Sequence, residues 1–270
     1  QIGWNDVVLL ERKKLASGTT WAAAGLVGQL WANKALTRLA QYGATLYAGL
    51  EMETGQPTGW KKSGSIRVAR TREREQEFDR AMDMAHGFGI PMEKISLAEA
   101  RRMIPVMSTD DLVAAWYQPD DGCTNPEDTT QALAKGARTR GARILQGVKV
   151  TDILRRNGAV CGVATDHGDI ACECVALCAG MWSWQIGRNA GVAIPLHAAE
   201  HMHLTTNPIA GVPAGMPYLR DMDGCIYVKE ETGGLLMGGF EPVAMPWRTL
   251  DIPDDFEHTN LQDNMELMEE

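Results

Sequence analysis

Two stretches of the chain consist of consecutive apolar residues and end in an acid or in small residues. Residues 7–10 read Val-Val-Leu-Leu and are followed by Glu11, and residues 175–177 lead into Cys178-Ala179-Gly180. Continuous apolar runs of this length are typical of strands in a parallel sheet, because such strands are buried on both faces. The pattern therefore predicts two buried parallel strands.

Other segments show apolar residues at helical spacing or in alternation with polar residues. The predicted helices cover residues 34–55, 71–87, 96–104, 126–141 and 181–190. The predicted strands between them cover residues 64–69, 112–117, 142–150, 151–153, 160–166 and 169–174. Thr71 and Ser96 are predicted N-caps, and Ser96 with Glu99 has the spacing of a full capping box.

The pattern becomes strand-rich from residue 194 onward. Strands are predicted at residues 196–206, 218–220, 225–229 and 235–238, and they indicate an antiparallel sheet that forms a second layer. The acidic segment beyond Trp247 is weakly patterned, and residues 265–270 resemble the start of a helix. The chain is thus predicted to be an α/β protein with two interleaved parts.

Glu11 has the position that a dinucleotide-binding domain gives to the acid that binds a ribose diol. The small and hydroxylated residues 17–25 that follow would let backbone amides approach a phosphate or a flavin ring. The alternative is an ordinary buried strand with a chance Glu. A Gly-rich phosphate turn should lie roughly 20 residues before the acid, which is before Gln1, so we expect the chain to be an internal fragment.

The second apolar run offers a similar choice. A strand that ends in Cys178-Ala179-Gly180 at a helix start would let a cofactor lie close to the backbone. A tight turn that needs Gly only for packing would have the same sequence. Both interpretations stay open on this segment alone.

Composition excludes several classes of partner. The formal charge of −9 argues against nucleic acid, because phosphate binding needs a basic face. No run approaches the roughly 18 apolar residues of a membrane span. The six cysteines are sparse and are expected to be reduced thiols, as in a cytoplasmic or mitochondrial-matrix protein, although Cys172 and Cys174 could be half of a metal clip.

Three histidines occur close together, at His197, His201 and His203. On the predicted strand they would share one face, since side chains alternate with a period of two. They could be metal ligands, catalytic acid–base residues or structural residues. No metal is expected, because ligands normally come from separate elements.

Three further residues are candidates for binding an anionic substrate. Tyr227 and Lys229 have the spacing to share a strand face, and Arg220 could bind a carboxylate with its guanidinium fork. Each also has a plainer interpretation: Tyr227 as an ordinary strand aromatic, Lys229 as a solvated lysine and Arg220 as a surface arginine.

Several motifs together resemble the sarcosine dehydrogenase and dimethylglycine dehydrogenase family, and the sarcosine branch in particular. The motifs are residues 6–12, residues 17–26, Glu53-Thr54-Gly55 with Gly59-Trp60, Gln29-Leu30, residues 119–122, Cys178-Ala179-Gly180 with Trp182, and Gly238-Gly239-Phe240-Glu241. The resemblance covers nearly the whole chain to about Trp247.

The resemblance implies a fold of the D-amino-acid-oxidase type. An incomplete FAD-binding domain of Rossmann type (residues 1–55 and 122–195) would be interleaved with an α+β substrate domain (residues 56–121 and 196–270) that contains the antiparallel sheet. By the resemblance, His201 and Tyr227 would be the active-site histidine and tyrosine. The implied FAD-binding residues are Glu11, Arg12, Ser17, Thr19, Thr20, Trp21, Ala24, Gly25, Val150, Ala179, Gly180 and Trp182.

Two positions depart from the family pattern. The family's flavin-linked histidine falls on Ala22, whose methyl group cannot form that bond, so we expect FAD to be bound non-covalently. His203 stands where relatives often have tyrosine, and with Arg220 and Lys229 it is a weaker candidate for binding substrate.

The resemblance implies oxidative demethylation of an N-methylated amino acid such as sarcosine. A hydride would pass from the N-methyl carbon to the flavin, and hydrolysis would give formaldehyde and the demethylated amine. An electron-transfer flavoprotein would be the acceptor. Two alternatives remain at this point: an oxygen-using amine or imino-acid oxidase of the same fold, and a truncated fragment without activity.

Overall fold

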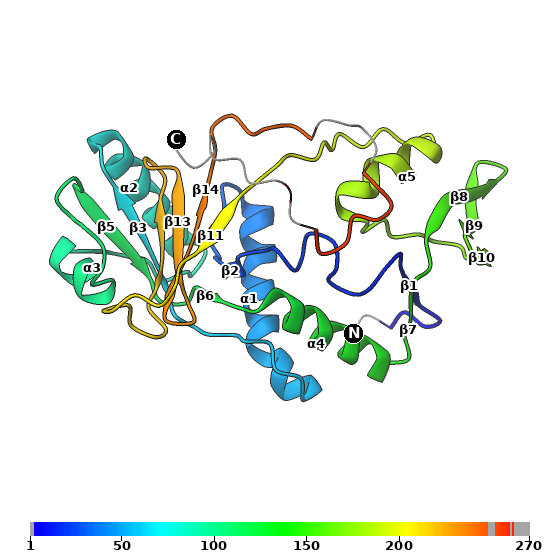
Figure 1. Cartoon of the computed structure of the whole chain (residues 1–270), viewed down its shortest axis with the longest axis horizontal. Helices are drawn as coiled ribbons and strands as arrows, with labels where there is room; N and C mark the ends of the chain where they lie inside the picture. The colour runs from blue at the N-terminus through cyan, green and yellow to red at the C-terminus, as the bar shows by residue number, and fades with distance from the viewer. Residues whose placement is uncertain (1–2, 248–251, 260, 262–270) are drawn as a thin grey trace. The chain divides into compact units, whose positions relative to one another are not determined.

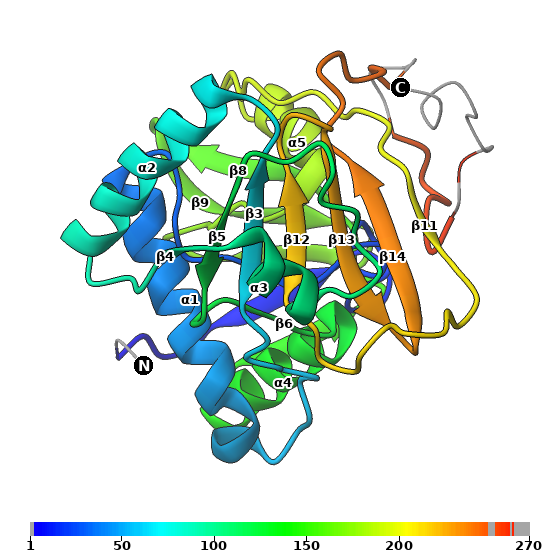
Figure 2. The same cartoon turned by 90° about the vertical axis from the view of Figure 1, so that its left-hand side faces the viewer.

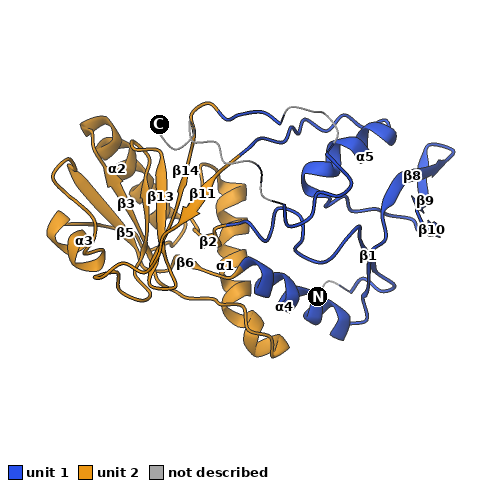
Figure 3. Ribbon diagram, viewed as in Figure 1, with its two compact units in different colours: residues 1–23, 126–200, 244–262 blue, residues 24–125, 201–243, 263–270 orange. Residues whose placement is uncertain are grey.

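The computed structural model describes residues 3–247, 252–259 and 261. The chain divides into two compact units (Figure 3), and each is made of segments that are distant in the sequence. Unit 1 contains residues 1–23, 126–200 and 244–262, and unit 2 contains residues 24–125, 201–243 and 263–270. The predicted helix start at residues 265–270 lies outside the described residues. None of the described helices is long and apolar enough to cross a membrane.

The grouping of residues 24–55 differs from the predicted domain boundaries, which placed them with the first domain. In the structure these residues belong to unit 2. Leu26 and Val27 pair with Gly122 and Cys123 of the same unit, and Leu30 is buried in a hydrophobic cluster of that unit. These contacts explain the grouping.

Unit 1 contains a short parallel sheet and a separate antiparallel meander (Figure 1). Its elements are β1 (Val8–Glu11), α4 (Pro126–Thr139), β7 (Arg143–Gln146), β8 (Val150–Arg156), β9 (Ala159–Thr165), β10 (Gly168–Ala171), the 3-10 helix η1 (Gly180–Trp182) and α5 (Ser183–Asn189). β1 pairs in parallel with β7, and Glu11 lies opposite Gln146. The predicted meander and the parallel pairing of the strand before Glu11 are confirmed. The predicted burial of that strand is wrong, since Val7 and Leu9 are exposed.

The second predicted buried strand, at residues 175–180, is wrong. Residues 174–179 form no regular element, and Cys178 is exposed. Among the described residues no strand pairs with this segment. An apolar run becomes a strand only where a neighbour supplies the hydrogen bonds for its backbone. The predicted helix that follows is present as η1 and α5.

Unit 2 is built on a seven-stranded sheet, which Figure 2 shows with its central strands side by side. The elements of the unit are β2 (Leu26–Val27), α1 (Lys34–Thr54), β3 (Ser65–Ala69), α2 (Arg72–Gly87), β4 (Glu93–Ile95), α3 (Leu97–Met103), β5 (Ala114–Gln118), β6 (Gly122–Cys123), β11 (His203–Thr205), β12 (Tyr218–Asp221), β13 (Ile226–Glu231) and β14 (Gly234–Gly239). The sheet order is β11-β14-β13-β12-β3-β5-β4. β12 and β3 are parallel, and every other neighbouring pair is antiparallel.

The predicted strand at residues 196–206 is reduced to β11, since only residues 203–205 pair with β14. Residues 196–202 contain a single isolated bridge, between Ala199 and Pro246. Of the three clustered histidines, only His203 therefore lies in a strand. The shared strand face predicted for all three is wrong.

Helix boundaries follow the predicted capping signals. Thr71 accepts a hydrogen bond from the Arg74 amide at the start of α2, and Ser96 and Glu99 form both bonds of a capping box at α3. Helix α1 ends at Gly55, whose φ of 62° is in the left-handed region that favours glycine.

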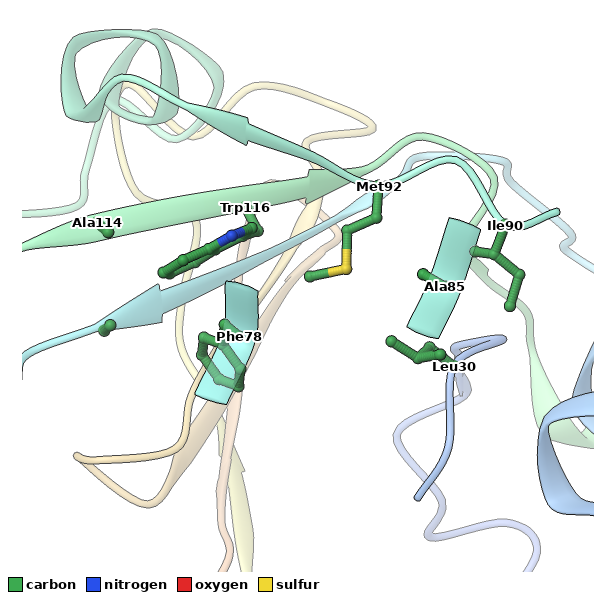
Figure 4. Close-up of a cluster of buried hydrophobic side chains, with 8 residues drawn as sticks. Leu30, Phe78, Ala85, Ile90, Met92, Ala114 and Trp116 are labelled. Atoms are coloured by element: carbon green, nitrogen blue, oxygen red, sulfur yellow. The ribbon is translucent and has the colours of Figure 1, made fainter. Parts of the chain in front are cut away.

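The two faces of the seven-stranded sheet differ in chemistry. One, here called the apolar face, carries Ile66, Val68, Ala115, Leu219 and Val228 and packs against α3 and the loop before β12. The other, here called the polar face, carries the alternate residues. α2 covers the β3–β5 end of the polar face, where Phe78 packs edge-on against Trp116 at 5.2 Å (Figure 4).

Candidate active site

His201, Tyr227 and Glu241 form a hydrogen-bonded chain in unit 2. His201 Nδ1 lies 3.0 Å from a Glu241 carboxylate oxygen, and His201 Nε2 lies 3.3 Å from the Tyr227 hydroxyl. An ionised carboxylate only accepts hydrogen bonds, so Nδ1 carries a proton. In the neutral ring Nε2 is then the acceptor, and the Tyr227 hydroxyl donates to it.

The ring of Tyr227 is fixed by its neighbours on the sheet. Gly238 lies directly opposite on β14, and a Cβ added there would overlap the Tyr227 phenol. Phe240 packs against the same ring at 5.2 Å. Burial and the nearby charge of Glu241 raise the pKa of Tyr227, so its hydroxyl keeps its proton at neutral pH.

His203 and Lys229 lie close to this chain of residues. His203, on β11, lies opposite Gly238 of β14. Burial, and then the charges of His201 and Lys229, lower the pKa of His203. Lys229 is buried and forms an ion pair with Glu231 at 2.8 Å. Because its charge already has a partner, Lys229 is a weaker candidate for binding substrate than the sequence suggested.

Arg220 faces Tyr227 from the neighbouring strand, where the two residues are opposite each other. Its guanidinium lies 5.2 Å from the ring centre of Phe240. Its Nε atom is buried and has no hydrogen-bond partner in the part of the chain that the structure describes. Arg220 is therefore not the surface arginine of the plainer interpretation.

His197, the first of the three clustered histidines, belongs to unit 1 and is exposed. Within the described ranges no group of three or more His, Cys, Asp or Glu residues is arranged to hold a metal.

In unit 1, Glu11 and Arg12 lie where the first strand ends. Glu11 accepts a hydrogen bond from the Lys13 amide at 2.9 Å. The Arg12 guanidinium bonds the Asp254 carbonyl and lies 4.7 Å from the ring centre of Trp182. The indole N–H of Trp182 is buried, and no described residue accepts a hydrogen bond from it.

The other predicted cofactor residues are distributed over both units. Ser17, Thr19, Thr20 and Trp21 lie in the turns after β1, Val150 begins β8, and Ala179 and Gly180 precede Trp182 in unit 1. Ala24 and Gly25 belong to unit 2, where the Gly25 carbonyl accepts from the Thr124 amide at 2.9 Å.

Three contacts in the site were not predicted from the sequence. Glu241 was noted only as part of a motif, yet it is the partner of His201. Phe256 packs against Trp182, and the His258 amide bonds the Ser17 carbonyl at 3.0 Å. Residues 252–259 carry no apolar periodicity, so only the folded chain could place them beside the residues after β1.

A family model described as FAD dependent oxidoreductase matches residues 1–270. The chain belongs to this family. It is 38% identical over 253 residues to 4-methylaminobutanoate oxidase (formaldehyde-forming) from Paenarthrobacter nicotinovorans. The matched region is 94% of this chain and 31% of that protein. It is also 37% identical over 265 residues to mitochondrial sarcosine dehydrogenase from Homo sapiens, and this match covers 95% of this chain and 28% of that protein.

The resemblance to sarcosine dehydrogenases that the motifs indicate is thus confirmed. The chain spans about three tenths of the length of these two relatives. Among solved structures, L-proline dehydrogenase from P. horikoshii is similar with a TM-score of 0.85 at 24% identity, covering 97% of this chain and 67% of that one. This likeness confirms the predicted fold class.

Glu11, Arg12 and Trp182 have the donor and acceptor groups that part of an FAD molecule would need. The Arg12 guanidinium and the unpaired Trp182 indole N–H are two donors close together, which suits phosphate oxygens. Only one oxygen of the Glu11 carboxylate bonds the adjoining turn, and a carboxylate has further acceptor capacity for a ribose diol. Ala22, which is half-buried, offers no atom for a covalent link.

Proposed function

We propose that the protein is an FAD-dependent oxidoreductase that oxidises an N-methylated amino acid of the sarcosine type. Membership of the FAD-dependent oxidoreductase family supports the cofactor. The names of the two curated relatives support the class of substrate. The observation that carries the proposal in this chain is the hydrogen-bonded chain Glu241–His201–Tyr227.

The substrate amine must lose a proton before its N-methyl carbon can give up a hydride, because oxidation needs the nitrogen lone pair. Aliphatic amines are protonated at neutral pH, as lysine is. The Tyr227 oxygen accepts a hydrogen bond from the ammonium while its own proton is donated to His201 Nε2. Glu241 holds the ring orientation and stabilises the imidazolium that proton transfer would create.

FAD supplies, when bound, the two-electron oxidation of the N-methyl carbon, and hydrolysis of the oxidised product then gives formaldehyde and the demethylated amine. Glu11, Arg12 and Trp182 would hold its ribose and phosphates, with Ser17, Thr19, Thr20, Trp21, Ala24, Gly25, Val150, Ala179 and Gly180 beside it. Arg220 would bind the substrate carboxylate.

His201→Asn tests the proposed relay. We expect turnover of sarcosine to fall by about 10²–10⁴-fold, the usual contribution of a general acid–base residue, and the acidic limb of the pH profile to shift. His197→Asn is the matched control, because His197 is exposed and lies in the other unit. A His201→Asn variant with unchanged turnover and pH profile would refute the role.

We propose that FAD is bound non-covalently, because Ala22 offers no atom for a covalent link. When the flavin-loaded protein is denatured with acid, we expect all of its flavin in the supernatant, measured by fluorescence. Flavin that stays with the precipitated protein would show a covalent link elsewhere on the chain.

We further propose that the protein is cytoplasmic, with the mitochondrial matrix as the alternative.

We also propose that an electron-transfer flavoprotein, not oxygen, accepts the electrons. Anaerobic reduction by sarcosine, followed by mixing with oxygen, tests the acceptor. Slow reoxidation supports a dehydrogenase, and reoxidation at the rate of turnover would indicate an oxidase.

A further inference from the structure

One row of side chains crosses all seven strands on the polar face of the sheet in unit 2. Strand register places its members directly opposite one another in turn. The row, from β11 to β4, is His203, Gly238, Tyr227, Arg220, Arg67, Trp116 and Lys94. Tyr227 belongs to the proposed active site, so the row continues from that site toward the middle of the sheet.

The middle of this row, with Gln118 beside it, holds buried hydrogen-bonding groups that have no partner among the described residues. They are Nε of Arg220, Nε of Arg67, Nε1 of Trp116, and both side-chain amide atoms of Gln118. Gln118 is 1% exposed and lies on the same face as Trp116, two residues along β5. Buried polar groups in native proteins are nearly always paired, so this concentration points to a ligand.

The kind of ligand follows from the balance of donors and acceptors. Four of the unpaired groups are donors, and the only unpaired acceptor is the Gln118 oxygen. Two of the donors belong to guanidinium groups, whose fork matches a carboxylate. A ligand that completes these unpaired groups would therefore bring acceptor atoms and negative charge.

Among the described residues, no carboxylate forms a hydrogen bond or a close ion pair with the Arg67 guanidinium. Arg67 makes one long hydrogen bond, from Nη2 to the Leu30 carbonyl at 3.4 Å, and lies 5.9 Å from the ring centre of Phe78. Asp121 is the nearby acid, but its oxygens accept from Ser65, Tyr218 and the Gln29 amide. Burial, then the charge of Arg220, lower the pKa of Arg67, and the nearby Asp121 and Glu77 only partly offset this effect.

The spacing of the strands indicates how far this region lies from the reacting end. Neighbouring strands are about 4.8 Å apart, so the backbone of Arg220 is one step from that of Tyr227 and the backbone of Arg67 is two steps, about 10 Å. In an N-methylglycine only two bonds separate the nitrogen from the carboxyl carbon. A carboxylate held jointly by Arg220 and Arg67 suits an acid with more carbons between these groups.

We infer that Arg67, together with Gln118, extends the substrate site along the sheet and binds the carboxylate of an N-methylamino acid with a chain longer than glycine. The inference rests on the proposed function for the position of the reacting amine. Arg220 serves acids of either length, and Arg67 sets the preference for the longer ones.

A chain-length series tests this with the flavin-loaded protein. The substrates are N-methylglycine, 3-(methylamino)propanoate and 4-(methylamino)butanoate. We expect Arg67→Met to lower kcat/KM for the longest acid by tenfold or more, about the effect of losing a hydrogen bond to a charged group, and to leave N-methylglycine nearly unchanged. Arg72→Met, which removes an exposed arginine of α2, is the control.

A binding measurement separates this inference from the proposed function. The probes are 4-(methylthio)butanoate and (methylthio)acetate, which have a thioether in place of the amine, and the readout is the rise in melting temperature on binding. We expect the longer acid to give the larger rise, and Arg67→Met to abolish that difference. If the protein oxidises no N-methylamine, the proposed function fails, but this binding difference still decides the role of Arg67.

The melting temperature without ligand separates a binding role of Arg67 from a purely structural one. An unpaired buried cation is destabilising, so if Arg67 serves binding, Arg67→Met should melt at the same temperature as the parent protein or higher. A lower melting temperature, with equal losses for all chain lengths, would overturn the inference. Unchanged chain-length preference in both Arg67→Met and Gln118→Leu would overturn it as well.

Discussion

The two faces of the seven-stranded sheet in unit 2 are built from alternate residues of the same strands, yet they do different work. On the apolar face, Ile66 and Val68 of β3 pack under α3 and form one closed hydrophobic cluster. On the polar face the intervening residue, Arg67, has a buried Nε atom without a partner among the described residues. Ile66 and Val68 thus serve stability, and Arg67 between them is assigned to binding.

This difference teaches where the free energy of folding comes from. Apolar area removed from water stabilises the fold by about 25 cal/mol per Å², whatever its orientation. Buried polar groups without partners reduce stability, and a protein keeps them where a ligand completes them. Substitutions on the two faces should therefore change different measurements.

The largest expected effect is on the apolar face. Ile66→Ala should lower the free energy of unfolding by about 2 to 5 kcal/mol, because Ile66 is fully buried and the substitution leaves a cavity. Urea denaturation measures this change. Ile66→Val is the control, with an expected loss of about 0.5 to 1.5 kcal/mol. A loss below that of the valine variant would mean that this face is not close-packed.

A smaller loss of stability, with a large loss of activity, is expected on the polar face from Gly238→Ala. The added methyl group would overlap the Tyr227 phenol, which must then move away from His201. We expect a loss of about 1 to 3 kcal/mol from overpacking, together with a fall in turnover. Gly49→Ala in α1 is the matched control, since an added Cβ there meets nothing within 4 Å. Full activity in Gly238→Ala would contradict the assigned position of Tyr227.

The smallest effect concerns the pH dependence of stability. The pKa of His203 is lowered from its ordinary 6.5 by burial and by the charges of His201 and Lys229. Below pH 6.5 the unfolded chain therefore binds more protons than the folded one, and stability falls as the pH falls through this window. His203→Gln should lose less stability than the parent between pH 7.5 and 5.5 in urea denaturation. An equal loss in both proteins would show that His203 does not titrate abnormally.

Local signals in the sequence predicted much of the fold. The capping box at Ser96, the N-cap at Thr71 and the alternation of residues 64–69 depend on neighbours within a few positions, and all are confirmed. Residues 175–180 have an equally clear apolar run but no pairing strand among the described residues. An apolar run shows that a segment can be buried, and only its partners make it a strand.

The candidate site was predictable in part for the same reason. The sequence singled out His201 and Tyr227, and the structure brings them within hydrogen-bond distance. It could not show that Arg67 lies opposite Arg220, because a pairing between residues so far apart depends on strand register. Side-chain partners across a sheet follow from topology, which no local pattern contains.

The parallel pairing of β3 with β12 has a consequence for how the protein is made. The two strands are separated in the sequence by most of unit 1, so a ribosome produces β3 and β5 long before β12 emerges. Until then one edge of β3 lacks its neighbour, and exposed strand edges promote aggregation. A nascent chain that stalls before Tyr218 should therefore depend on chaperones, and binding of a holdase chaperone should end once β12 has left the exit tunnel.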